Sequence, residues 1–426
     1  MDRDDERMSQ DQIQGSAMTK FQAFIRRLKE TVPFYRDRLK AVNPDDIRTA
    51  GDIENLPFTF KTDLRGAYPF AMLGVDISAV QEFHATSGTT GSAVITAYTD
   101  QDLALWRRAM GRVFDRANVG PLDIVHNAYG YGLFTGGLGM HYGAIAVGAA
   151  VLPMSGGYTQ RQVTMLRDLQ ATAICSTPSY ALHIAEAMAK MDVSAQDLHL
   201  RVGIFGAEPW SLEMCKQLER AFGIAALDVY GLAEIIGPGV ASECEDGHEG
   251  MHVAEDLFYF EVVDPRSGRC VPDGNPGELV LSSFLREATP VLRYRTGDIT
   301  QVITTPCPCG RTTRRIDHIQ GRVDDMFTLR GVNLFPREIE AALLQMEELA
   351  PVYQLILDRQ VALDTLGVHV EPRHPQVVRD TLGLAVKDRL NRQLGINVHV
   401  TIQEPGSIPR SEGKAVRVVD RRQLLR

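Results

Sequence analysis

Short apolar runs alternate with amphipathic segments through the middle of the chain, and this alternation limits the possible folds more than any other feature. The runs cover residues 124–128, 149–152, 173–176, 202–205 and 225–229, and each is bounded by Gly, Pro or Ser. Helical patterns such as 160–169 and 180–191 lie between them. Runs this short and this apolar are typical of strands buried on both faces. The sequence therefore predicts an α/β protein with parallel sheets covered by helices.

The pattern changes after the last of these runs. Residues 257–263 and 277–283 read as strands separated by Gly, Pro and Asp turns, which predicts an antiparallel, barrel-like portion. From Pro336 a further helix, strands at 353–357 and 366–370, a helix from Pro375 and a strand at 398–402 follow.

These patterns divide the chain into three parts. We expect a flexible leader over 1–17, with the first helix starting near Thr19, and a large multi-layer domain over 18–321. A small, mobile α+β domain over 322–426 completes the expected architecture.

Composition excludes several classes of partner. Lys+Arg 45 against Asp+Glu 54 gives a net charge of −9, so the chain has no general attraction for nucleic acid. The most apolar stretch, 143–154, is about half as long as a bilayer crossing requires. Residues 1–17 lack the apolar core of a secretory signal, and 6 cysteines in a chain of 426 residues are too few for a disulfide scaffold. We therefore expect a cytoplasmic protein without a membrane or nucleic-acid partner.

Several turns carry groups suited to a nucleotide. Residues 86–91 (T-S-G-T-T-G) combine hydroxyls with glycines that allow an anion-binding nest, although no Walker lysine follows and a plain hairpin turn is the alternative. Residues 228–234 end an apolar run with an aromatic ring for stacking on a base and a carboxylate for Mg²⁺. Residues 294–298 offer a carboxylate to ribose hydroxyls, or form a surface turn with an Arg–Asp pair. The segments 321–325 and 413–415 are weaker signals, since a lone lysine is usually solvated.

The order and spacing of these segments resemble the adenylate-forming superfamily, and within it the phenylacetate–CoA ligase family. The resemblance runs from Phe34 to Arg422. It rests on the strings K-T-D-L-R (61–65), Y-P-F (68–70), Y-G-Y-G-L-F-T-G-G (129–137), S-T-P-S-Y (176–180), G-P-G-V (237–240) and R-G-V-N-L-F-P (330–336). It implies ATP-dependent activation of an aryl or arylacetic acid as an acyl-adenylate. The acyl group then passes to the thiol of CoA, releasing AMP and pyrophosphate.

The resemblance also implies which residues bind ATP. The loop would hold the phosphates, the A-E-P segment the adenine and ribose, Asp228 the adenine amino group, and Asp298 the ribose hydroxyls. Tyr230 would stack on the ring, and Arg322 would support the ribose–phosphate region. The complete implied set is Ser87, Gly88, Thr89, Thr90, Gly91, Ala207, Glu208, Pro209, Asp228, Tyr230, Gly231, Asp298, Arg322 and Lys61.

The implied catalytic residues are Lys414, Glu234 and Thr90. Attack of a carboxylate on a phosphate brings two anions together, and a cation with Mg²⁺, held by Glu234, offsets that repulsion. Lys414 would act in the first step only, because the small domain then turns about a hinge at Asp324 to admit the thiol. The loop continues Ser92-Ala93, without the lysine common in the superfamily. Lys61 is a candidate substitute, with a plain surface charge as the alternative.

An apolar slot for the acid is expected around 129–140 and 235–238. Its candidate residues are Tyr131, Phe134, Gly137, Met140, Ile236 and Pro238. Core packing is the alternative for all of them, and for Met140 it is equally favoured. Hydroxy- or aminobenzoate-type acids fit this pattern as well as phenylacetate.

Cys307 and Cys309 in C-P-C-G-R, with Cys244 in C-E-D-G-H-E-G-M-H, offer thiolates for a structural, tetrahedral Zn²⁺. The resemblance implies one Cys–His and one Cys–Cys pair, which favours His252 as the fourth ligand, with His248 as the alternative. Three reduced thiols in neighbouring loops are the simpler interpretation.

Two other functions remain open at this point. A stand-alone adenylating enzyme would keep every residue above but load the acid onto the phosphopantetheine thiol of a carrier protein. A non-catalytic, zinc-stabilised nucleotide-binding or scaffold protein is disfavoured by intact Lys414, Glu234 and Asp298. The resemblance is also compatible with a homodimer.

Overall fold

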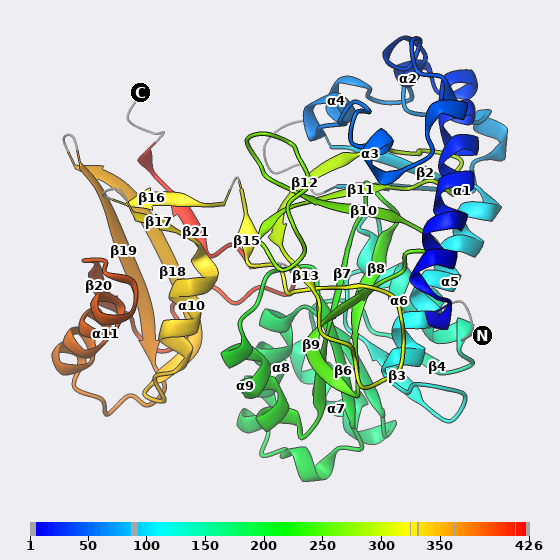
Figure 1. Ribbon diagram of the computed structural model, residues 1–426. Helices are drawn as coiled ribbons and strands as arrows, with labels where there is room; N and C mark the ends of the chain where they lie inside the picture. Colours follow the sequence, from blue (N-terminus) through cyan, green and yellow to red (C-terminus); the bar gives the residue numbers. More distant parts are fainter. Residues whose placement is uncertain are drawn as a thin grey trace.

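A nine-stranded sheet forms the centre of the large domain in the computed structural model, which describes residues 6–86, 93–323, 325–329, 332–360, 363–413 and 415–422 (Figure 1). The strand order is β13-β14-β9-β8-β7-β6-β5-β3-β4. A parallel group consists of β3 (Ile124–Asn127), β4 (Ala150–Pro153), β5 (Ala173–Ser176), β6 (Val202–Gly206) and β7 (Ala225–Leu232). These strands coincide with the apolar runs, so the predicted α/β class with parallel layers is confirmed.

Helices cover both faces of this sheet. They are α5 (Asp100–Arg116), α6 (Thr135–Ala146), α7 (Thr159–Asp168), α8 (Pro178–Lys190) and α9 (Leu212–Phe222). Successive residues of a strand point to opposite faces. Cys175 and Ile204 accordingly belong to the core formed with α5 and α6, whereas Ile174 and Phe205 belong to the core formed with α7, α8 and α9. This double burial explains why the strands read as continuous apolar runs.

Antiparallel strands extend and flank the central sheet. The four-stranded sheet β10-β11-β12-β15 is antiparallel, which agrees with the strands expected near 257–283. Its strands are β10 (Tyr259–Val263), β11 (Gly277–Ser282), β12 (Tyr294–Thr300) and β15 (Gly321–Arg322). The remaining strands of the large domain are β1 (Glu82–Ala85), β2 (Ile95–Tyr98), β8 (Gly237–Cys244), β9 (Gly247–Val253), β13 (Val302–Ile303) and β14 (Arg315–Ile316).

The first of the N-terminal helices begins earlier in the chain than expected. These helices are α1 (Gln10–Thr31), α2 (Pro33–Arg38), α3 (Ala50–Ile53) and α4 (Lys61–Gly66). Ser9 caps α1 in a reciprocal arrangement with Gln12, and Ile13 and Ala17 are buried. Residues 10–17, expected to be part of a flexible leader, are therefore the first turns of a docked helix. The apolar residues in these turns are too sparse to show a helical period by themselves.

The C-terminal part has its own sheet and core. It contains β16 (Phe327–Leu329), β17 (Val332–Leu334), α10 (Pro336–Leu344), β18 (Leu349–Gln360), β19 (Leu363–Pro372), α11 (Arg379–Leu394), β20 (His399–Ile402) and β21 (Val418–Asp420). The sheet order is β20-β19-β18-β21, with a separate hydrophobic cluster beneath it. Figure 1 shows this part as a distinct layer joined to the large domain beside β15. The observed α11 begins four residues after Pro375, where its helix was expected to start.

No described helix combines the length and apolar character needed to cross a membrane.

Candidate functional site

A cleft of about 440 Å³ opens where the parallel strands end. Its walls include residues that directly follow β3, β5 and β6, such as Ala128, Thr177 and Ala207, together with the end of β7. Glu412 and Gly413 of the C-terminal part complete it. The carboxyl edge of an open α/β sheet is the usual place for a ligand, because the loops that follow neighbouring strands diverge there.

Most described residues that sequence reasoning selected meet in this cleft. They are Lys61, Phe134, Met140, Ala207, Glu208, Pro209, Asp228, Tyr230, Gly231, Glu234, Pro238, Asp298 and Arg322. Ser87, Gly88, Thr89, Thr90, Gly91, Asp324 and Lys414 lie outside the described residues. Segments that are far apart in the chain thus come together, as a nucleotide-binding site would require. The roles of the individual residues stay predictions.

Tyr230, Asp298 and Arg322 form one hydrogen-bonded group. The Tyr230 hydroxyl donates to Asp298 Oδ2 at 2.6 Å, and Arg322 Nη1 donates to Asp298 Oδ1 at 2.8 Å. Asp298 and Arg322 are cross-strand partners on β12 and β15, which places their side chains side by side. Burial and the neighbouring carboxylate raise the pKa of Tyr230 well above its ordinary value, so the phenol remains a hydrogen-bond donor.

Glu234 and Lys61 lie together at another part of the cleft. The Glu234 side chain is 6% exposed, and Lys61 Nζ is 3.6 Å from Glu234 Oε1. The Tyr294 hydroxyl donates to the same oxygen at 3.2 Å. Lys61 is the first residue of α4, so the helix start presents a cation beside the expected magnesium ligand. Tyr294 was not selected from the sequence, although it opens the 294–298 segment.

Asp228 is buried, and burial raises the pKa of its carboxyl to about 6. Its backbone amide donates to Glu243 Oε2 at 2.8 Å, and His318 Nε2 lies 2.9 Å from Glu243 Oε1. Although burial disfavours the imidazolium, hydrogen bonds to Asp317 and Glu243 raise the pKa of His318 to about 10. A protonated His318 therefore pairs with Glu243 behind the strand that carries Asp228. Sequence reasoning missed Glu243 and His318, because neither stands in a recognisable motif.

Three of the residues expected to bind the acid do not line the cleft. The Tyr131 hydroxyl accepts from Asn127 Nδ2 at 2.7 Å. A Cβ at Gly137 would lie 2.5 Å from the Gly130 carbonyl oxygen, so glycine allows α6 to approach that turn. Ile236 is fully buried in the core. Tyr131, Gly137 and Ile236 are thus absent from the lining, and Phe134, Met140 and Pro238 form its apolar surface.

Cys244, His252, Cys307 and Cys309 form a compact cluster whose ligand atoms all lie within 4.8 Å of one another. The Cys244 and Cys307 sulfurs are 3.6 Å apart, and Cys309 Sγ is 3.3 Å from His252 Nε2. These spacings fit a tetrahedral zinc site, in which Zn–S bonds of about 2.3 Å separate two sulfurs by about 3.8 Å. His248 instead faces Glu243, with Nδ1 3.9 Å from Oε2. The fold therefore places His252, and not His248, beside the three cysteines.

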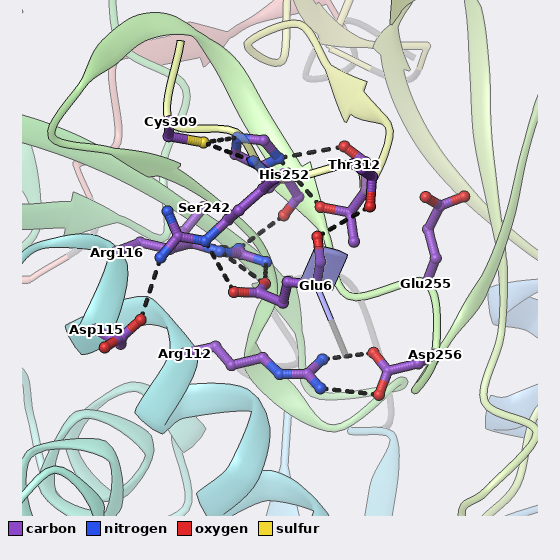
Figure 2. Close-up of polar contacts among 12 residues, drawn as sticks. Glu6, Arg112, Asp115, Arg116, Ser242, His252, Glu255, Asp256, Cys309 and Thr312 are labelled. Carbon is purple, nitrogen blue, oxygen red and sulfur yellow. Dashed lines mark hydrogen bonds and ion pairs between the residues drawn. The ribbon is translucent and has the colours of Figure 1, made fainter. Parts of the chain in front are cut away.

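Ion pairs support this cluster from the side of the N-terminus (Figure 2). Arg116 Nη1 donates to the His252 carbonyl at 2.8 Å, and its guanidinium also pairs with Glu6. Arg311, two residues after Cys309, donates to Glu6 Oε2 at 2.9 Å and to Asp115 Oδ2 at 3.1 Å. Glu6 thus ties the N-terminal segment to α5 and to the cysteine loop. Its place in a polar stretch gave no sequence signal.

Known proteins similar to this chain are AMP-binding enzymes, which agrees with a nucleotide site in the cleft. Residues 83–284 match the AMP-binding enzyme family, and residues 331–422 match the AMP-binding enzyme C-terminal domain. The chain is 43% identical over 428 residues to phenylacetate-coenzyme A ligase of Escherichia coli (strain K12), covering 99% of this chain and 97% of that protein. It is 41% identical to the phenylacetate-coenzyme A ligase of Thermus thermophilus, covering 98% of each.

A solved structure resembles the whole molecule. 2-Hydroxyisobutyryl-CoA ligase in the postadenylation state, in complex with 2-HIB-AMP, superposes with a TM-score of 0.94 at 30% identity, covering 99% of this chain and 92% of that one. The same enzyme with 2-HIB-AMP and CoA in the thioesterification state gives a TM-score of 0.74 at the same coverage. The domain arrangement described above is thus more similar to the postadenylation state.

Proposed function

Because the chain belongs to the phenylacetate–coenzyme A ligase family of adenylate-forming enzymes, we propose that it activates an aryl or arylacetic acid. It is an AMP-forming acid–thiol ligase, which makes an acyl-adenylate from ATP and a carboxylic acid and transfers the acyl group to CoA. Identity over nearly the whole chain to phenylacetate-coenzyme A ligases is the observation that carries the choice of acid. The uncharged lining at Phe134, Met140 and Pro238 supports it.

The contacts in the cleft support a separate role for each of several residues in ATP binding. Asp298, which already contacts Tyr230 and Arg322, would accept hydrogen bonds from the ribose hydroxyls. Asp228 would contact the adenine amino group. Glu234 fits a Mg²⁺ ligand because its buried carboxylate faces the cleft, and Mg²⁺ held there would neutralise phosphate charge. Lys61 adds a cation beside it. Lys414 would neutralise the charge that develops between the acid and the α-phosphate, since its neighbour Gly413 lines the same cleft.

The second half-reaction would require another domain arrangement. The attacking thiol must reach the adenylate carbonyl after pyrophosphate has left. We place the hinge at Asp324, between a large domain ending at residue 321 and a small domain starting at 322. The separate cores of the two parts support this division.

A panel of acids in ATP–pyrophosphate exchange tests the choice of substrate. We expect exchange with phenylacetate or substituted benzoates, and acyl-CoA on addition of CoA. Exchange with aliphatic acids alone would reject the aryl assignment. Thioester formation on a carrier protein but not on CoA would contradict the acceptor. Light scattering of the same preparation distinguishes a monomer from the homodimer that the family resemblance allows.

We also propose that Cys244, His252, Cys307 and Cys309 hold a structural Zn²⁺. Four protein ligands leave no open position for chemistry, and thiolate ligands suit the reducing cytoplasm, where we place the protein. Metal analysis of purified protein should find about one zinc per chain, and Cys307→Ser should lose most of it. Cys270→Ser is the matched control, because this exposed thiol is outside the cluster. Less than about a tenth of an equivalent in the wild type excludes the site.

A further inference from the structure

The chain on both sides of Lys414 is bonded to the large domain. Thr177 Oγ1 donates to the carbonyl of Gly413 at 3.0 Å, and the amide of Ala415 donates to Glu208 Oε2 at 3.1 Å. The C-terminal segment that carries these residues runs between the two domains in Figure 1. The backbone around the expected catalytic lysine is therefore anchored from the nucleotide side of the cleft.

Arg417, three residues further on, reaches both domains. Its Nη2 donates to Ser179 Oγ at 2.7 Å and lies 3.8 Å from Glu208 Oε1 in the large domain. Its Nη1 pairs with Glu340 of α10, whose side chain is 0% exposed. Glu340 Oε1 in turn accepts from the amide of Ser211 at 3.0 Å. One guanidinium thus joins a buried carboxylate of the small domain to the start of α8 and to the loop after β6.

On release, each side of this bridge keeps partners within its own domain. Glu208 Oε1 also accepts from the Ser179 amide at 2.7 Å and from the Ser179 hydroxyl at 2.5 Å, within the large domain. Arg417 keeps Glu340 within the small domain, and the Tyr353 hydroxyl donates to Glu340 Oε2 at 3.0 Å. Glu208 gives up its cation on release but keeps its hydrogen bonds from Ser179, whereas the more deeply buried Glu340 keeps its charged partner, whose loss would be costly. The contact is therefore suited to repeated docking and release.

We propose that Arg417 is a positioning residue that docks the Lys414 segment for adenylation. It does so by bridging Glu340 to Ser179 and Glu208, and its release accompanies the change to thioester formation. Glu208 also lines the cleft, so the nucleotide side and the docked domain share one carboxylate. The greater similarity to the postadenylation state of the solved ligase agrees with a docked arrangement. The inference rests on the proposed roles of Lys414 and the cleft.

The test measures the two half-reactions separately: ATP–pyrophosphate exchange, and CoA thiolysis of a supplied acyl-adenylate. Arg417→Ala should slow exchange by about tenfold or more, since misplacing a catalytic group by an ångström costs up to about a hundredfold. Thiolysis should change by less than about twofold. Arg417→Lys should recover part of the exchange rate, because it retains the charge without the planar fork. Arg422→Ala is the matched control: Arg422 pairs with Asp364 and Asp420 of the same domain, and both rates should be unchanged.

A second variant keeps the test decisive if Arg417→Ala does not fold. Arg417→Ala leaves Glu340 without its charged partner, which can destabilise the small domain. Ser179→Ala removes the hydroxyl of the large domain that accepts from Arg417, and it leaves the Arg417–Glu340 pair intact. It should also slow exchange and spare thiolysis. A folded Ser179→Ala or Arg417→Ala protein in which both rates fall together, or neither falls, overturns the proposal. No exchange by the wild type with any acid would instead reject the proposed function.

Discussion

At the level of single residues, several buried charges of this protein lie in ion pairs. Glu6 pairs with Arg116 and Arg311, and Arg112 pairs with Asp256 by two donors (Figure 2). A buried charge that loses its partner destabilises the fold by several kcal/mol, typically about 3–5. Each pair therefore fixes the relative position of two segments that are distant in the chain.

Glu6→Gln should destabilise the protein in a pH-dependent manner. Burial alone would raise the pKa of Glu6, but Arg116, Arg112 and Arg311 together lower it from 4.5 to about 2. A carboxyl with a lowered pKa contributes stability above its unfolded-state pKa and loses it as the pH falls toward the folded value. The variant should be about 3 kcal/mol less stable at pH 7, and the deficit should shrink below about pH 4.5.

Urea unfolding of both proteins at pH 7, 5 and 4 would measure this deficit. Measuring the zinc content of every sample shows whether zinc release contributes at low pH. Glu30→Gln, at an exposed position of α1, is the control and should match the wild type throughout. A deficit that stays constant across this pH range would contradict the assigned ionisation of Glu6.

At the scale of elements, helix starts connect the layers. Thr99 and Asp102 form a reciprocal cap at the start of α5, as Thr49 and Asp52 do at α3. Asp102 is fully buried and also accepts from the amides of Glu287 and Ala288, at 2.7 and 2.9 Å. One carboxylate therefore caps a helix and fixes the connection between β11 and β12.

Asp102→Ala should therefore cost more stability than Asp52→Ala. Loss of an exposed cap costs about 1 kcal/mol, and the buried amides of Glu287 and Ala288 would add about 1–3 kcal/mol when left unpaired. Denaturant unfolding of the two variants measures the difference directly. Equal losses would mean that the contacts of Asp102 outside its helix contribute nothing to stability.

At the scale of the whole molecule, the proposed mechanism assigns different domain arrangements to the two half-reactions. The small domain supplies Glu412 and Gly413 to the cleft in the present arrangement. A thiol needs access to the carbonyl of the adenylate once pyrophosphate has left. The proposed rotation about a hinge would meet both requirements with one cleft, because the acid and nucleotide would stay in place.

Lys414→Ala should separate these steps. Without the cation, acyl-adenylate formation should fall by about a hundredfold or more, since such groups stabilise transition-state charge by several kcal/mol. Thiolysis of a supplied acyl-adenylate should remain within about threefold of the wild type, because the proposed rotation would move Lys414 away from the site. Rapid-quench measurement of both steps checks the expectation. Equal loss of both steps in a folded variant would contradict the domain-rotation mechanism.

Local patterns were sufficient to predict the parallel α/β part of the large domain. Strands β3, β5, β6 and β7 were predicted within a few residues, because a strand buried on both faces is apolar along its whole length. The order of short motifs also indicated adenylate chemistry, and most of the described motif residues meet in one cleft. Both signals depend on neighbours in the chain, so they can be recognised without the fold. The start of α1 was missed because its first turns carry few apolar residues.

Contacts between distant segments were decided by the tertiary structure alone. His252 rather than His248 joins the cysteines, since the two imidazoles of β9 face different groups. Tyr131 and Ile236 do not line the cleft, and Arg417 spans the domain interface. Such contacts join residues tens to hundreds of positions apart, and local periodicity carries no information about which of them meet. The sequence by itself thus determined the class of fold and the family chemistry. Packing determined which side chains face the cleft, the cluster and the interface.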